Sequence, residues 1–395
     1  MKHASLHALA TLAAATCLVA CPRTNSMDAD AAMADAGPSP YRDAGAPLLT
    51  ESWLCQRASD ASFLGWFPIA PGVDTYVSRP LLSAGVWAGG TVAFGWAATA
   101  ERGEGGAAGV VFPFEPEPVP PADDDRNVFL FRDPAADPYR VPTPGFTAMG
   151  SALVLVDPWG DNRQIVMLDP VRRSPRIARE LPGAPAPGET IAIAARDGGL
   201  LVTWGDATLL RLGGSLEPDG PPDTLAIPAE QPRLVRTDAG MVWLAPGVCG
   251  LLTTWLDAEG RPADAPICVS SVPEQRAVEP IWDGARIVVP YDGGIQELDG
   301  RGRGAGWTPV DGTALAAIGT REGLLALVRP TDDVSTVELR LVERRTGALL
   351  RSLGSDGPGP YAILSGAAAV SSGEAFMVFH IDYTGRLDPI EIACD

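Results

Sequence analysis

The sequence predicts an all-β protein on three observations: frequent turn residues, short apolar runs, and a glycine-centred phrase that recurs along the chain. The 395 residues include 44 Gly and 38 Pro, which interrupt the chain too often for long helices. The apolar runs are about four to seven residues long and bounded by Gly, Pro or Asp, as strands are. With 46% hydrophobic and 20% charged residues, the chain can bury a sizeable core.

The recurring phrase, found past residue 145, is an acidic or small residue, one or two glycines and then four or five apolar residues. Its glycines are Gly150, Gly199, Gly240, Gly284, Gly323 and Gly373, at intervals of 49, 41, 44, 39 and 50 residues. Each unit also has an apolar stretch before the phrase and one or two after it, which makes about four strands per unit. Four antiparallel strands in about 40 to 50 residues are typical of one blade of a β-propeller.

The number of blades follows from the length left over. Six units of about 45 residues span 145 to 395, and residues 50 to 144 leave room for one more blade and its insertions. The excess length there falls in a Pro-rich and acidic stretch, residues 112–125. We therefore predict seven blades, with six or eight as alternatives, in a single domain over residues 49–395. A ring of blades is usually closed by pairing the last strand with one from the other terminus, which we place near Cys55.

The first 21 residues have the layout of a secretory signal, with a basic start, an Ala/Leu-rich run and a cysteine. Leu18-Val19-Ala20-Cys21 resembles the lipobox of bacterial lipoproteins. The resemblance implies a signal peptide over residues 1–20 and lipidation of Cys21, which attaches the mature chain to a membrane. An ordinary signal peptide, or an uncleaved anchor, is the alternative. Residues 21–48 are rich in Ala, Asp and Pro and lack apolar periodicity, which predicts a disordered tether.

Four cysteines remain once the signal peptide and the lipid account for the first two of six. An even number in an exported protein suggests disulfides, and four cysteines permit three pairings. Cys249 and Cys268 fall in one expected hairpin, whereas Cys55 and Cys394 mark the two ends of the folded region. We therefore predict the pairs Cys249–Cys268 and Cys55–Cys394, with buried free thiols as the alternative. A metal site is disfavoured, because neither pair has C-x-x-C spacing and no histidine lies nearby.

The charged residues exclude several kinds of chemistry. The balance of 30 Lys and Arg against 49 Asp and Glu gives a net charge of −19, which argues against binding nucleic acid or anionic lipid surfaces. The only lysine is Lys2, and the histidines are His3, His7 and His380, so the mature chain would keep one histidine and no lysine. That excludes a Schiff base, a P-loop lysine and a histidine metal cluster. We predict no cofactor, no metal and no catalytic residue.

His380 is the one imidazole that could serve as a base. It lies in the apolar run MVFHIDY, and Asp382 follows two residues later, which puts both side chains on one face of a strand. A base with its orienting carboxylate is one interpretation. A strand histidine satisfied by a neighbour is the one we favour.

Acidic turns and tryptophans offer two further candidates. Residues 123–125 and the turn 157–162 could bind calcium through oxygen ligands, although solvated turns are the interpretation we favour. Trp96, Trp204 and Trp243 close equivalent apolar runs. They could form an aromatic platform for a ligand, but packing between blades is the interpretation we favour.

As a whole, the pattern resembles the divergent propeller lipoproteins of high-GC bacteria, with turns such as Leu-Asp-Ala-Glu-Gly-Arg-Pro at residues 256–262. We predict a lipid-anchored, non-catalytic binding or assembly module at the cell envelope, on the periplasmic face or the outer membrane. Its partner would be another envelope protein or a glycan. The alternative is an envelope glycan hydrolase or lyase that uses carboxylates on one propeller face. Such an enzyme should show clustered carboxylates around the central channel, at least one with a raised pKa.

Overall fold

The structure, a computed structural model, describes residues 55–57, 77–88, 91–100, 106–111, 128–133, 145–157, 163–169, 174–183, 189–205, 207–225, 227, 231–247, 249–269, 280–320, 323–332, 336–356, 364–371, 375–382 and 387–394. Side chains are described between residues 145 and 353 of these ranges. Every regular element in them is a β-strand, and they contain no helix that could span a membrane. The chain divides into two compact units, 1–45 and 46–395, and all described strands belong to the second.

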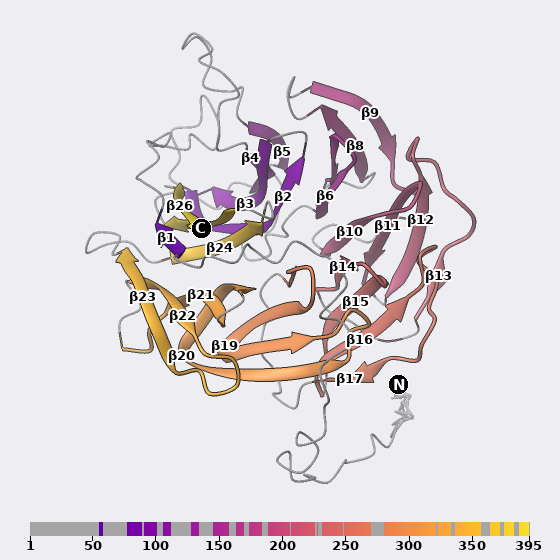
Figure 1. The fold of residues 1–395 in the computed structure, drawn as a ribbon. Helices are drawn as coiled ribbons and strands as arrows, with labels where there is room; N and C mark the ends of the chain where they lie inside the picture. The colour runs from indigo at the N-terminus through magenta and orange to yellow at the C-terminus, as the bar shows by residue number, and fades with distance from the viewer. Residues whose placement is uncertain are drawn as a thin grey trace, which may run out of the picture. The chain divides into compact units, whose positions relative to one another are not determined.

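Most strands form four-stranded antiparallel sheets in chain order (Figure 1). The first blade is β2 (Val77–Ala88), β3 (Thr91–Ala100), β4 (Gly106–Val111) and β5 (Val128–Asp133). The second blade is β6 (Gly145–Met149), β7 (Ala152–Val156), β8 (Gln164–Asp169) and β9 (Ser174–Glu180). The third blade is β10 (Ile191–Arg196), β11 (Gly199–Trp204), β12 (Thr208–Gly213) and β13 (Asp223–Thr224). The fourth blade is β14 (Arg233–Thr237), β15 (Gly240–Gly247), β16 (Gly250–Leu256) and β17 (Ile267–Cys268).

One sheet has six strands and spans two repeats of the glycine phrase. Its strands are β18 (Ile281–Trp282), β19 (Ile287–Leu298), β20 (Gly304–Gly319), β21 (Leu324–Arg329), β22 (Val337–Val342) and β23 (Leu349–Asp356). Residues 304–309 of β20 pair with β19, whereas residues 314–319 pair with β21. The long strand β20 therefore ends one set of strands and begins the next.

The last four-stranded sheet joins strands from distant parts of the chain. Its strands are β24 (Leu364–Ser371), β25 (Ala375–Asp382), β26 (Leu387–Cys394) and β1 (Cys55–Arg57), in the order β1-β26-β25-β24 (Figure 1). The strand β1 lies antiparallel to β26, with Cys55 opposite Cys394. The closing strand predicted near Cys55 is thereby confirmed.

The first strands of the successive sets contact one another in a closed cycle. Contacts run from β2 to β6, β10, β14, β18, β20 and β24, and from β24 back to β2. A closed cycle of four-stranded antiparallel sheets is the architecture of a β-propeller. The cycle has seven members if the halves of the six-stranded sheet count separately and six if that sheet counts once. The number of seven blades therefore stays a prediction.

The core lies between neighbouring sheets. All residues of β7 and β11 are buried. In β11, Val202 packs in one apolar cluster with Val154 of the second blade, whereas Leu201 packs in another with Met241 and Trp243 of the fourth. Successive side chains of a strand point to opposite faces, so a middle strand packs against the sheets on both sides. Stacking of sheets, rather than pairing within one sheet, therefore buries most of the apolar surface.

Candidate functional site

A buried cluster of charged side chains joins the two halves of the six-stranded sheet. Arg344, in the turn after β22, donates from Nη1 to Oε1 of Glu297 in β19. Its Nη2 lies 3.4 Å from the carbonyl oxygen of Thr320, to which it donates, and 3.9 Å from Oδ2 of Asp283. The side chains of Asp283 and Glu297 are 4% and 8% exposed, and that of Arg344 is 33% exposed. Solvent therefore reaches the guanidinium but hardly reaches the two carboxylates.

Local backbone features hold these carboxylates in place. Asp283 follows β18 directly, and its Oδ1 accepts backbone N–H groups at 2.9 and 2.7 Å from the second and third residues after it. Asp favours such turns, because its short side chain can bond to nearby backbone. Gly319 provides the space for the ion pair, since a Cβ there would collide with Asp283 Oδ2 and Arg344 Nη2. The sequence uses glycine at this position because a side chain and the cluster cannot both fit.

Burial determines the protonation chemistry of the cluster. It raises the pKa of Glu297, while the charges of Arg344 and Arg286 lower it and that of Asp283 raises it further. A raised pKa is what the glycan hydrolase hypothesis requires of an acid. Here, however, Arg344 bonds to Glu297 and lies near Asp283, and both carboxylates are buried. The arrangement links the two halves of the six-stranded sheet and offers a substrate no open pair of carboxylates.

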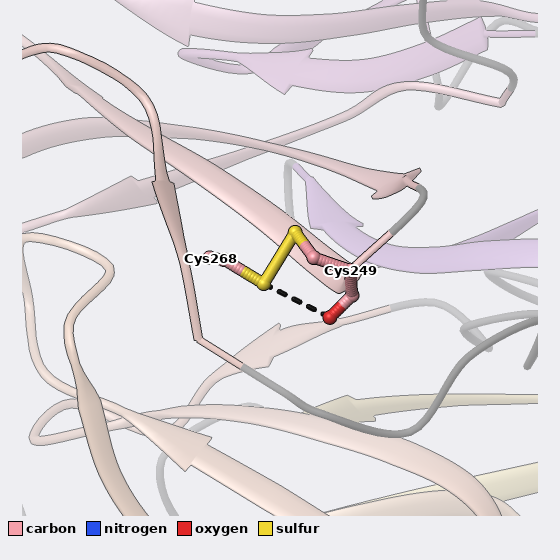
Figure 2. Close-up of a disulfide and its surroundings, with 2 residues drawn as sticks. All are labelled: Cys249 and Cys268. Carbon is pink, nitrogen blue, oxygen red and sulfur yellow. Dashed lines mark hydrogen bonds between the residues drawn. A yellow bond between two sulfur atoms is a disulfide. The ribbon is translucent and has the colours of Figure 1, made fainter. Parts of the chain in front are cut away.

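The disulfide lies at the outer edge of the fourth blade. Cys249 is in the turn between β15 and β16, and Cys268 ends β17, with 6.1 Å between their Cα atoms. Figure 2 shows the bond, together with the short contact of 2.9 Å between Cys268 Sγ and the Cys249 carbonyl oxygen. Only two register pairs, Leu252↔Cys268 and Thr253↔Ile267, connect β17 to β16. The disulfide is therefore a main attachment of this outer strand.

Two of the three tryptophans singled out in the sequence belong to the core. Trp204 is 6% exposed and packs with the apolar cluster between the second and third blades. Trp243 is fully buried between the third and fourth, and its Nε1 donates to Thr203 Oγ1 at 3.3 Å. The packing interpretation is confirmed for these two residues. The side chain of Trp96 lies outside the described residues.

The structure leaves other candidates untested. His380 in β25 pairs in register with Ala367 and Asp388, but its side chain and that of Asp382 are outside the described part. Cys21 and residues 123–125 also lie outside it, as do residues 158–162 of the acidic turn. Among described side chains, no three of His, Cys, Asp and Glu are grouped so that they could hold a metal ion.

Sequence reasoning did not find the cluster of Asp283, Glu297 and Arg344. Asp283 opens one of the glycine phrases, and Glu297 lies in the apolar stretch after it. Each looks like an ordinary turn or strand residue until the turn that carries Arg344 packs beside them. One feature of the sequence could have indicated the cluster: Glu297 lies within an otherwise apolar strand, and a buried glutamate usually has a partner of opposite charge.

Comparison with known proteins identifies the fold. No protein-family model and no curated protein matches the chain. The WD40 domain of Neurospora crassa Pan2 is similar in structure, with a TM-score of 0.50 and 9% identity over 88% of this chain and 97% of that domain. The Dos1 propeller is also similar, with a TM-score of 0.46 and 11% identity over 79% of this chain and 78% of that one. The likeness to Pan2 and the closed cycle of sheets together show that the protein is a β-propeller.

Proposed function

We propose that this protein is a lipid-anchored β-propeller that acts as a non-catalytic binding or assembly module at the cell envelope. The supporting observation is the Cys249–Cys268 disulfide. Disulfides persist in oxidising compartments and are rare in the cytosol. An exported protein fits the basic and apolar N-terminal segment, which ends in the lipobox-like residues 18–21.

Lipid at Cys21 would hold the protein on a membrane face. Each buried methylene contributes about 0.8 kcal/mol, and two or more chains make stable an attachment that is marginal with one. Residues 21–48 would then act as the tether. A flexible chain of about 27 residues has a root-mean-square reach on the order of 30 Å, enough to keep the propeller clear of the headgroups.

Binding rather than catalysis fits the chemistry that the mature chain would retain. It would have no lysine and one histidine, and Glu297, the carboxylate with a raised pKa among the described side chains, is bonded to Arg344. Propellers carry loops at both ends of their strands, where a partner can dock without reaction chemistry. We infer that the partner is another envelope protein or a glycan.

Lipidation is tested with Cys21→Ser in the full chain, with Cys17→Ser as the matched control. Cells are labelled with an alkyne-tagged palmitate analogue and separated into soluble and membrane fractions. We expect label and membrane association for the wild type and for Cys17→Ser, and neither for Cys21→Ser. A Cys21→Ser protein that stays labelled and membrane-bound contradicts the proposed anchor.

The binding role is tested by chemical crosslinking in intact envelopes, followed by affinity capture and mass spectrometry. We expect one envelope protein or glycan to be enriched with the wild type over a membrane-anchored control propeller. The purified protein is also incubated with isolated envelope glycans. Release of glycan fragments, lost on substitution of a carboxylate, would instead support the hydrolase or lyase.

A further inference from the structure

The closure of the ring depends on a very short strand. The strand β1 has three residues, which pair with the end of β26 as Cys55↔Cys394, Gln56↔Ala393 and Arg57↔Ile392. On its other side β26 pairs with β25 from Ala375↔Ala393 to Ile381↔Leu387. The ladder that closes the ring is therefore the weaker of the two, because it has far fewer hydrogen-bonded positions.

The register brings two cysteines to directly opposite positions at this ladder. Opposed residues of antiparallel strands have Cα atoms about 4.5 to 5.5 Å apart. A disulfide requires about 4.4 to 6.8 Å between Cα atoms. The backbone therefore places Cys55 and Cys394 within bonding range without rearrangement, and the disulfide-bonded pair Cys249 and Cys268 has a comparable spacing of 6.1 Å.

We propose that Cys55 and Cys394 form a disulfide that locks the closing strand, a covalent clasp between β1 and β26. The two thiols form the bond by exchange with the disulfide of an exported oxidoreductase, which is reduced to its dithiol and takes up both electrons and both protons. The clasp rests on the proposed function in one respect, because it needs an oxidising compartment.

The position of the clasp gives it a specific role. Cys55 is the first residue of β1, and Cys394 is the last residue of β26. A fluctuation or pull that arrives along the chain from the anchor meets the disulfide at the first ladder pair, before it reaches the other two. Without it, a terminal strand of three residues would fray, because short edge ladders open with little free energy. The clasp passes the load to β26, which is paired on both sides.

Peptide mapping tests the bond directly. The full chain is purified from its native membrane in the presence of an alkylating agent and digested with trypsin without reduction. The sequence predicts that Cys55 falls in peptide 43–57 and Cys394 in peptide 387–395, so the clasp joins two peptides. Cys249 and Cys268 share peptide 237–276, because the bond between Arg261 and Pro262 resists trypsin. The two disulfides therefore give different products.

Each outcome decides the proposal. A linked species of 43–57 and 387–395 that separates on reduction supports the clasp. Alkylated Cys55 and Cys394 beside an intact bond in 237–276 overturn the clasp but leave an exported protein. Alkylation of all four cysteines overturns the clasp and also the proposal that the protein resides in an oxidising compartment. A link from either 43–57 or 387–395 to 237–276 overturns the pairing.

Variants test the role of the clasp. In Cys394→Ser, we expect amide exchange of β1 and of the end of β26 to rise on the order of a hundredfold, with β16 and β17 unchanged. The matched control Cys268→Ser should show the reverse: amide exchange becomes faster in β16 and β17 and stays as in the wild type in β26. Equal exchange of β26 in Cys394→Ser and the wild type would overturn the role as a clasp. If Cys394→Ser fails to fold, Cys268→Ser, which keeps only the proposed clasp, is compared before and after reduction with a dithiol.

Discussion

The turn after β12 in the third blade and the turn after β16 in the fourth have the same backbone hydrogen bonds, displaced by 44 residues. In the third blade the bonds run from Gly213 N to Glu217 O (2.8 Å), from Leu216 N to Gly213 O (2.9 Å) and from Leu225 N to Ala207 O (3.1 Å). In the fourth blade the corresponding bonds run from Asp257 N to Arg261 O (2.9 Å), from Gly260 N to Asp257 O (2.9 Å) and from Val269 N to Leu251 O (2.9 Å). The blades differ in what holds the outer strand that follows.

In the third blade an ion pair holds the outer strand. Arg211 bonds to Asp223 of β13 and donates from Nη2 to the Pro221 carbonyl oxygen at 3.3 Å. The corresponding residues of the fourth blade are Trp255 and Ile267, which cannot form an ion pair. There the Cys249–Cys268 disulfide holds β17. The comparison shows that the backbone pattern specifies the edge, while either charge or a covalent bond can secure it.

The turns also differ at the residue with left-handed backbone. Leu216 has φ 64° and is 1% exposed, within the cluster between the second and third blades. Gly260 has φ 78°, and a Cβ there would lie 3.1 Å from Cδ1 of Leu201 in the preceding blade. Glycine adopts this conformation freely, whereas leucine is strained in it. In the third blade the burial of Leu216 offsets that strain.

The largest expected effect is the loss of the covalent attachment in the fourth blade. Closing a loop of about 20 residues contributes roughly 3 kcal/mol to the free energy of unfolding in the chain-entropy model, so Cys268→Ser should lower it by about that amount. Denaturant unfolding of the wild type and the variant measures the difference. In excess dithiol, which reduces the disulfides of both proteins, the wild type and Cys268→Ser should become equally stable. Equal stability in oxidising buffer would mean that the turn alone holds β17.

Leu216→Gly gives the third blade the residue that the fourth has at this position. We expect a loss of about 2 kcal/mol, because removal of a buried leucine costs about 3 kcal/mol and relief of the strained φ returns about 1. Leu216→Ala keeps the strain and should cost more than Leu216→Gly, the reverse of the usual order. Thermal unfolding of both variants measures this order. An alanine variant more stable than the glycine variant would show that strain is not significant at Leu216.

Asp223→Asn removes the ion pair of the third blade and leaves the turn intact. The Arg211 side chain is 9% exposed and that of Asp223 is 40% exposed, so water weakens the pair and we expect a loss of about 1 kcal/mol. The effect should shrink at high salt, since a half-exposed pair is screened. Unfolding at low and high salt measures it, with Glu259→Gln, an exposed carboxylate in the corresponding turn of the fourth blade, as the control for loss of a charge. A salt-independent loss would indicate a packing role instead.

The smallest expected effect concerns the turn after β22, where Arg344 bonds to Glu297 of β19. Burial raises the pKa of Glu297 above its usual 4.5, so the folded state holds this proton more tightly than the unfolded state. The stabilisation from the protonated group is full below about pH 4.5 and is lost as the pH rises through the folded pKa.

We therefore expect the wild type to lose stability relative to Glu297→Gln as the pH rises from about 4.5 through the folded pKa of Glu297. Above that pKa, the difference in free energy of unfolding between the two proteins should stay constant. Urea unfolding at several pH values measures the difference, with Glu343→Gln, in the same turn, as the control. A difference that grows in the opposite direction would mean that Arg344 outweighs the burial of Glu297.

The propeller and its turns were predictable because their signals are local. The glycine phrase repeats within single blades, and the turn at residues 256–262 carries its own acidic and glycine residues. The pair Cys249–Cys268 belongs to one expected hairpin, so proximity in sequence implied proximity in space. The exception is instructive: Leu216 occupies a position where the pattern of the fourth blade would predict glycine, and its side chain is buried in the apolar cluster that the second and third blades form together.

The sequence by itself determined the all-β class, the propeller repeat and the need for a closing strand near Cys55, because strand period, turn residues and repeat length act over short stretches of chain. Only the tertiary structure decided that β20 runs from one set of strands into the next, that Arg344 neutralises Glu297, and that Cys55 lies directly opposite Cys394. Those outcomes depend on which strands pack side by side. Contacts between residues far apart in the chain are set by the shape and register of whole sheets, which no local pattern specifies.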